Sequence, residues 1–174
     1  KEYSKEQIEL AIIQFDSDVK VLRLPSLVKR GDRLPVLQVR GLNTNTVGAV
    51  RKAMSIIENR KIEHKMKGLS YYRPWIILLT DGNPNPCSQS ELQSLLYDVS
   101  HSISENKFML TAIGIGNSVD KEFLSAISNN NYHRIGQANI STFFQALSAS
   151  MTMKYGNDPQ DNLSIELDNE LQDD

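Results

Sequence analysis

The chain has 174 residues and a formal net charge of -2, with 19 Lys and Arg against 21 Asp and Glu. A chain of this length is most simply one domain, and it can bury a core without disulfides or a structural metal. The balanced charge gives no general basic face, which nucleic-acid binding normally requires, so we expect no nucleic-acid partner.

The lengths of the apolar runs and the number of cysteines limit the cellular locations that fit this sequence. No apolar run approaches the roughly 20 residues of a membrane-spanning helix, so we expect no membrane association. Cys87 is the only cysteine, which rules out an intrachain disulfide and a Cys-rich zinc site. A reducing compartment fits best, and we expect a cytoplasmic protein.

The first elements predicted are a pair of strands. Residues 8–15 form a short apolar run that is closed by Asp16-Ser17-Asp18, which predicts a buried strand followed by a turn. Residues 19–24 are the expected hairpin partner. A connection punctuated by Pro25, Gly31 and Pro35 follows.

A helical pattern begins at Thr46, where apolar residues recur at three- and four-residue spacing. We expect this helix to fade in the charged segment 59–67. Ser, Thr and Asn are favoured at helix N-termini, and Thr46 in particular is the candidate cap.

Strands and helices then alternate to residue 151. Ser88 and Glu91 have the spacing of a capping box and predict a helix start. The other expected elements are strands at 75–80, 108–115 and 132–135 and helices at 120–127 and 141–151. This alternation predicts parallel pairing and a three-layer α/β domain.

The composition changes after Lys154. Residues 155–174 are rich in Asn, Asp, Gln and Glu and poor in apolar residues, so they cannot bury enough surface to offset their ordering entropy. We therefore expect a domain at 1–154 and an acidic, flexible tail at 155–174.

The abrupt stop of an apolar run at Asp81 is the most informative feature for function. A buried parallel strand that ends this way places one carboxylate at the carboxyl edge of a sheet, where open α/β sheets bind ligands. Asp81-Gly82 also suits a simple turn, and both interpretations stay open.

A second polar loop, residues 41–48, precedes the first helix and contains Thr44. A Thr44 hydroxyl and an Asp81 carboxylate from neighbouring loops would make an oxygen-only site. Such a site suits Mg²⁺ or Mn²⁺ with several waters retained.

These segments resemble the von Willebrand factor type A family over residues 8–151. The family pattern combines D-x-S-x-S after the first strand, a threonine loop before a helix, and an aspartate after an apolar strand. NTNTVGAVRKA matches the threonine loop at Thr44, and WIILLTDGNPN matches the aspartate at Asp81. The segment RPWIILLTDG is most similar to bacterial intracellular members, including tellurite-resistance-associated proteins.

The resemblance implies a Rossmann-like fold with a mostly parallel central sheet, one antiparallel edge strand and flanking helices. It also implies a metal-ion-dependent adhesion site that binds an Asp or Glu of another protein and is not catalytic. Thr44 would bind the metal directly or through water, and Asp81 would balance its charge. The rim would comprise Asn43, Asn45, Gly82 and Asn83. A scaffold or assembly factor in a bacterial stress response is the implied role.

One part of the family pattern is missing, because the sequence has no D-x-S-x-S and IELAIIQFDSD resembles the family's second strand. The first strand, its metal loop and the next helix are therefore expected upstream of Lys1. We expect the sequence to be a fragment; the alternatives are a second chain that completes the sheet, or a cleaved or disordered segment.

Two other functions stay open. Asp16-Ser17-Asp18-Val19 resembles the start of haloacid dehalogenase-like phosphohydrolases, with Asp16 as nucleophile, Asp18 as general acid/base and Mg²⁺ between phosphate and carboxylates. GIGNS, however, lacks the acidic pair that such enzymes place there. The other alternative is a structural domain of the same family with a non-functional metal site.

Overall fold

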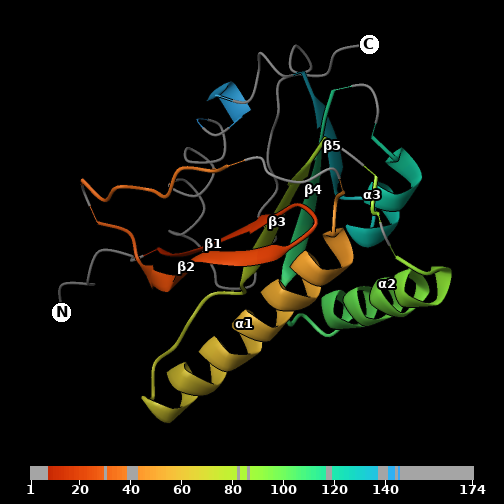
Figure 1. Cartoon of the computed structure of the whole chain (residues 1–174). Coiled ribbons are helices and arrows are strands. Elements are labelled where there is room, and N and C mark those ends of the chain that lie inside the picture. Colours follow the sequence, from red (N-terminus) through yellow and green to blue (C-terminus); the bar gives the residue numbers. More distant parts are fainter. Residues whose placement is uncertain are drawn as a thin grey trace. The chain divides into compact units, whose positions relative to one another are not determined.

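The computed structural model describes residues 8–29, 31–38, 43–81, 83–85, 87–116, 119–136, 141–143 and 145 (Figure 1). The strands are β1 (Glu9–Phe15), β2 (Val19–Leu27), β3 (Trp75–Thr80), β4 (Met109–Ile115) and β5 (Tyr132–Ile135). The helices are α1 (Thr46–Met66), α2 (Gln89–Ser104) and α3 (Lys121–Ile127). Within this described part, every helix is too short or too polar to cross a bilayer.

The chain divides into two compact units. The first comprises Lys1–Ser70 and Pro84–Leu95, and the second comprises Tyr71–Asn83 and Leu96–Asp174. The predicted tail at 155–174 and most of the predicted helix at 141–151 lie outside the described residues, so the domain boundary at 154 stays a prediction.

In the first unit, β1 and β2 form the predicted antiparallel hairpin. β2 continues past the predicted end at residue 24 and includes Pro25. Proline has no N–H to donate, and strands tolerate it at irregular positions. The pairing is irregular here, because the register shifts between Leu10 and Ile12, whose partners are Ser26 and Arg23. That irregularity accommodates Pro25 without breaking the strand.

The start and end of α1 both differ from the sequence prediction. Asn45, not Thr46, caps the helix, since its side-chain oxygen accepts a hydrogen bond from the Gly48 N–H at 2.9 Å. Thr46 is instead the first helical residue and is fully buried. The helix also continues through the charged segment to Met66. Ion pairs with helical spacing, Arg60 with Glu63 and Lys61 with Glu58, support that last part.

An ion cluster joins β1 to α1. The Glu9 carboxylate pairs with the Arg60 guanidinium and lies 3.2 Å from His64 Nε2. The hydrogen bond from Arg60, followed by that from His64, lowers the pKa of Glu9 to about 2. Glu9 is therefore ionised at neutral pH, where its ion pair joins the strand to the helix.

In the second unit, β3, β4 and β5 form a parallel sheet with β4 in the middle (Figure 1). Burial is deepest along β4, where every residue except the last is buried. The core includes Ile113, Ile135 and Phe143, all fully buried. Asp120 caps α3 by accepting the Phe123 N–H at 2.9 Å. The three predicted strands and the α3 helix are confirmed here.

A buried hydrogen-bond network links β3 to β4. The Trp75 indole N–H donates to Thr111 Oγ1 at 2.9 Å, and the Asn131 amide donates to the same oxygen at 2.7 Å. Asn131 also donates to the Leu110 carbonyl at 3.3 Å. Thr111 is fully buried, so these bonds satisfy a hydroxyl that burial would otherwise penalise.

The predicted capping box at the start of α2 is confirmed. The Ser88 N–H donates to Glu91 Oε2 at 2.8 Å, and the Glu91 N–H donates to Ser88 Oγ at 3.2 Å. Further along the helix, Leu95 and Val99 are buried as the apolar spacing predicts.

Candidate functional site

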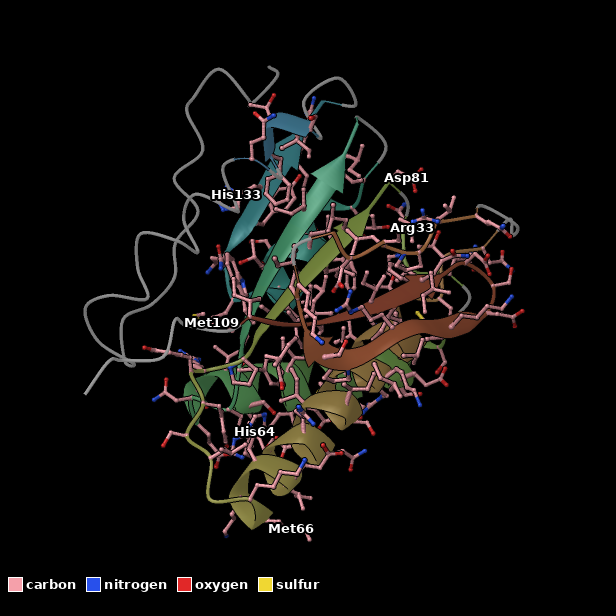
Figure 2. The ribbon with its side chains drawn as sticks, turned by 90° about the vertical axis from the view of Figure 1, so that its left-hand side faces the viewer. Arg33, His64, Met66, Asp81, Met109 and His133 are labelled. Atoms are coloured by element: carbon pink, nitrogen blue, oxygen red, sulfur yellow. The ribbon has the colours of Figure 1, made fainter. Side chains whose placement is uncertain are left out.

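The candidate carboxylate, Asp81, follows the last residue of β3 (Figure 2). Thr80 is only 5% exposed, whereas Asp81 is exposed. Among the described residues, none forms a hydrogen bond or ion pair with the Asp81 carboxylate. The strand therefore fixes the backbone at this position while the carboxylate remains available to a ligand.

Two predicted rim residues, Gly82 and Asn83, follow Asp81 in the sequence. Asn83 is exposed, and Gly82 lies outside the described residues. Asn43, the rim residue predicted beside Thr44, is also exposed.

The Thr44 loop is held in place by backbone hydrogen bonds. The Thr44 N–H donates to the Asn85 carbonyl at 2.7 Å, and the Asn85 N–H donates back at 2.9 Å. The next residue, Asn45, donates its N–H to the Asp16 carbonyl at 2.8 Å. Within the part of the chain that the structure describes, the Thr44 hydroxyl has no hydrogen-bond partner. A fixed backbone thus carries a hydroxyl that is free to bind a ligand.

Asn45 differs from the other rim candidates because its amide oxygen already caps α1. Gly48 makes this geometry possible, since a Cβ at that position would lie 2.7 Å from Asn45 Oδ1. Asn45 therefore helps to shape the loop through the helix start.

The donor chemistry of Thr44 and Asp81 fits a hard divalent cation, because both offer oxygen ligands. Thr44 belongs to the first unit and Asp81 to the second. Mg²⁺ takes roughly six oxygen ligands and keeps several waters, so each of these oxygens would fill one position of such a set. The described residues contain no group of three or more His, Cys, Asp or Glu that could hold a metal ion.

Asp16 and Asp18, the residues of the phosphohydrolase alternative, lie in the turn between β1 and β2. The Asp18 N–H donates to Asp16 Oδ1 at 2.9 Å, and the Asp16 N–H donates to the Asp18 carbonyl at 3.0 Å. One Asp16 carboxylate oxygen therefore closes the hairpin turn.

The three histidines have separate local environments. His64 contacts Glu9, and His101 pairs with Glu105 at 3.2 Å while stacking on Tyr97. Burial lowers the pKa of His133 on β5.

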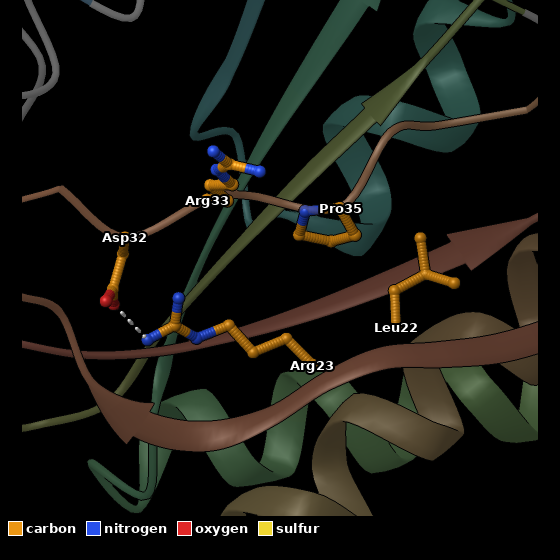
Figure 3. Close-up of a pocket in the computed structure, with 5 residues that line it drawn as sticks. All are labelled: Leu22, Arg23, Asp32, Arg33 and Pro35. Carbon is orange, nitrogen blue, oxygen red and sulfur yellow. Dashed lines mark hydrogen bonds and ion pairs between the residues drawn. The ribbon is translucent and has the colours of Figure 1, made fainter.

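One hollow was not predicted from the sequence. It has a volume of about 410 Å³ and is lined by Leu22, Arg23, Asp32, Arg33 and Pro35 (Figure 3). The sequence predicted only a connection around Gly31 and Pro35. The concentration of basic residues among leucines in this segment is the signal that could have indicated it.

A family model for the von Willebrand factor type A domain matches residues 2–149 of the chain. No curated protein matches the chain closely enough to count as a relative. The family match confirms the resemblance predicted from the threonine and aspartate segments. It also confirms the fold class, since these domains have a Rossmann-like α/β fold.

Proposed function

We propose that this chain, which belongs to the von Willebrand factor type A family, is a metal-dependent protein-interaction module. Domains of this family commonly mediate metal-dependent protein interactions and are generally not enzymes. The proposed ligand is an Asp or Glu side chain of a partner protein. Thr44 and Asp81 are the proposed metal-binding residues.

The observation that carries this proposal is the environment of Asp81. A carboxylate directly after a buried strand, without an internal partner among the described residues, is available for a ligand at a fixed backbone position. A purely structural turn residue would use its oxygens on nearby N–H groups, as Asp16 does on Asp18.

A bound Mg²⁺ or Mn²⁺ would supply an open coordination position for the partner's carboxylate. Thr44 would contribute a neutral hydroxyl, and Asp81 would balance the charge. Asn43, Gly82 and Asn83 would form the polar rim around the partner's side chain, with Asn45 setting the loop from the helix start.

We propose the biological setting from the resemblance of one segment. We infer that residues 73–82, with the sequence RPWIILLTDG, resemble bacterial intracellular members of the family, including tellurite-resistance-associated proteins. We therefore place the protein in the cytoplasm, as a scaffold or assembly factor in a bacterial stress response. The single cysteine supports a reducing compartment.

A second candidate is a domain of the same family that binds its partner without metal. The observation favouring it is the lack of any cluster of three or more metal-ligating side chains among the described residues. Mg²⁺ would then leave the stability and binding of the protein unchanged.

Metal binding by the chain itself tests the proposal. Mn²⁺ would be titrated into the protein and the free ion measured by electron paramagnetic resonance, since bound Mn²⁺ loses its sharp signal. We expect saturable binding that Mg²⁺ displaces. Asp81→Ala should abolish it, and Thr44→Val should weaken it.

Asp18→Ala is the matched control, because it removes an exposed carboxylate from the hairpin turn. Binding that survives Asp18→Ala and is lost in Asp81→Ala supports the proposed site. The reverse pattern would favour the phosphohydrolase alternative, and no binding at all would favour metal-independent interaction.

A further inference from the structure

The surface formed by β2 and residues 31–38 combines exposed apolar side chains with a hollow. Leu24, Leu34, Val36 and Leu37 are between 56% and 82% exposed. Single exposed apolar residues are common, but a concentration of them over one short segment marks a binding surface. All of these residues belong to the first unit.

The hollow adds a free positive charge to this surface (Figure 3). Arg23 pairs with Asp32 at 2.9 Å, and Figure 3 shows its side chain extended toward that carboxylate. Arg33 lines the same hollow and forms no ion pair or hydrogen bond with any residue that the structure describes. Leu22 and Pro35 supply apolar lining. The hollow thus offers an available guanidinium beside apolar carbon.

The local charge of this segment is opposite to that of the whole chain. Residues 19–38 contain five Lys and Arg and one Asp, although the chain carries a net charge of -2. Asp32 is already engaged by Arg23, so within residues 19–38 the positive charge is in excess, and the nearest further acids in the sequence are Asp16 and Asp18 in the hairpin turn. An acidic ligand is therefore favoured.

Contacts with β1 and with Arg23 on β2 hold the segment in place before any ligand binds. Gln14 on β1 donates its amide to the Gln38 carbonyl at 2.6 Å and accepts the Gln38 N–H at 2.9 Å. The Asp32 carboxylate also accepts the Lys29 N–H at 3.1 Å. A pre-organised surface loses less entropy on binding than a mobile one.

We propose that this surface, defined by Leu22, Leu24 and residues 31–37, binds an acidic, leucine-rich peptide segment of another polypeptide. Residues 161–174 have this chemistry: they contain six Asp and Glu, three Leu and one Ile, with no Lys, Arg or His. Carboxylates of the peptide pair with Arg33, and its leucines cover the exposed apolar side chains. This surface is separate from Thr44 and Asp81, so the inference goes beyond the proposed metal-dependent function.

A fluorescein-labelled peptide with the sequence of residues 161–174 would test this inference by fluorescence anisotropy against the full chain. The buffer would contain EDTA, so the outcome is independent of the metal-binding proposal. We expect saturable binding that weakens as salt rises from low to high concentration, because exposed charge pairs are screened. Because the full chain carries the same segment, the peptide is also titrated into a full-length variant whose own residues 161–174 have Asn and Gln in place of Asp and Glu. Absence of binding to both proteins overturns the inference.

Reversing the charge of Arg33 tests whether the peptide binds at the proposed surface. Arg33→Glu should weaken peptide binding about tenfold or more, since it replaces attraction with repulsion at the interface. Lys121→Glu on α3 changes the net charge by the same amount at another exposed position and should leave binding unchanged. Equal weakening by both variants would show a general charge effect and overturn the inference.

A modified peptide gives a second test that does not depend on folding of the variants. Replacing every Asp and Glu of the peptide with Asn and Gln keeps its length and leucines but removes its charge. The neutral peptide should bind much more weakly to the unaltered chain. If both peptides bind equally, charge complementarity does not select the ligand.

Discussion

β1 and β4 are strands of equal length, seven residues each, and both are apolar, yet they differ in burial. Every residue of β4 except the last is buried, whereas no residue of β1 is fully buried. β4 pairs with strands on both sides, while β1 pairs only with β2 among the described strands. Burial is therefore set by the neighbours of a strand, and similar apolar sequences contribute unequally to stability.

The largest expected difference in stability comes from truncating one isoleucine side chain in each strand. Ile113→Ala in β4 removes a fully buried side chain and should lower the free energy of unfolding by about 3–4 kcal/mol. Ile13→Ala in β1 removes a half-buried one and should cost about 1–2 kcal/mol, because less apolar surface returns to water. Urea denaturation measures both values. Equal losses would contradict the contrast.

A smaller effect is expected from adding one methyl group beside β4. In Gly114→Ala the new Cβ would lie 2.8 Å from Val119 Cγ2 and 3.2 Å from Leu124 Cδ1. Overpacking of this kind should cost about 1–3 kcal/mol. The double variant Gly114→Ala/Val119→Ala should be more stable than the sum of the single changes predicts, because Val119→Ala removes the closest contact. Strict additivity in urea denaturation would show that this clash is not the cause.

The ion cluster makes β1 sensitive to pH. The folded-state pKa of Glu9 is about 2, below the ordinary value of 4.5. A lowered pKa means that the stabilisation is present above the unfolded pKa and is lost as the pH falls from 4.5 toward 2.

Glu9→Gln should therefore lower stability near pH 7 by about 1–2 kcal/mol, as for a charged hydrogen bond at a partly exposed site. The variant should also show a shallower loss of stability between pH 5 and 3 than the unaltered chain. Glu122→Gln at an exposed position of α3 is the control. Parallel pH profiles for the Glu9 variant and the unaltered chain would exclude this role.

The smallest expected effects come from helix caps in the two units. Asn45→Ala removes the cap of α1, and Asp120→Ala removes the cap of α3. Each should cost about 1 kcal/mol in thermal or urea unfolding. Thr46→Ser keeps the first helical residue small and hydroxylated, and it should perturb the helix start less than Asn45→Ala does. If Thr46→Ser lowered the stability more than Asn45→Ala does, Thr46 and not Asn45 would be the cap of α1.

The sequence predicted the parallel strands well because their signals are local. The run from Trp75 to Thr80 and the run ending at Ile115 are short and apolar, and polar turns follow both. Ser88 and Glu91 carry a complete capping box within four residues. These features depend little on contacts with distant parts of the chain.

The errors occurred where distant contacts decide the structure. α1 persists to Met66 partly because Arg60 pairs with Glu9, and the two residues are 51 positions apart. Asn45 caps the helix because its loop is tied to Asp16 and its neighbour Thr44 to Asn85. The i,i+3 pairs of Arg60 and Lys61 are visible in the sequence, but no periodic pattern shows the contacts of Glu9, Asp16 and Asn85.

The candidate residues were identified from the sequence, but their surroundings were not. Asp81 and Thr44 stood out through strand-end and loop patterns, and the structure adds that neither side chain has a partner among the described residues. The hollow at Arg33 is lined by residues of β2 and of the segment after it, and it was not predicted from the sequence. Its role in binding stays a prediction, as does the metal-binding role of Thr44 and Asp81.

Trp75 gives the parallel sheet its own optical signal. It is the only tryptophan in the chain, and its indole N–H is bonded to Thr111 on the neighbouring strand. Its fluorescence therefore reports the separation of β3 from β4, while circular dichroism averages over the helices and strands of both units. Coincident transitions with the two methods would show that the units unfold as one cooperative system, and separate transitions would give each unit its own stability.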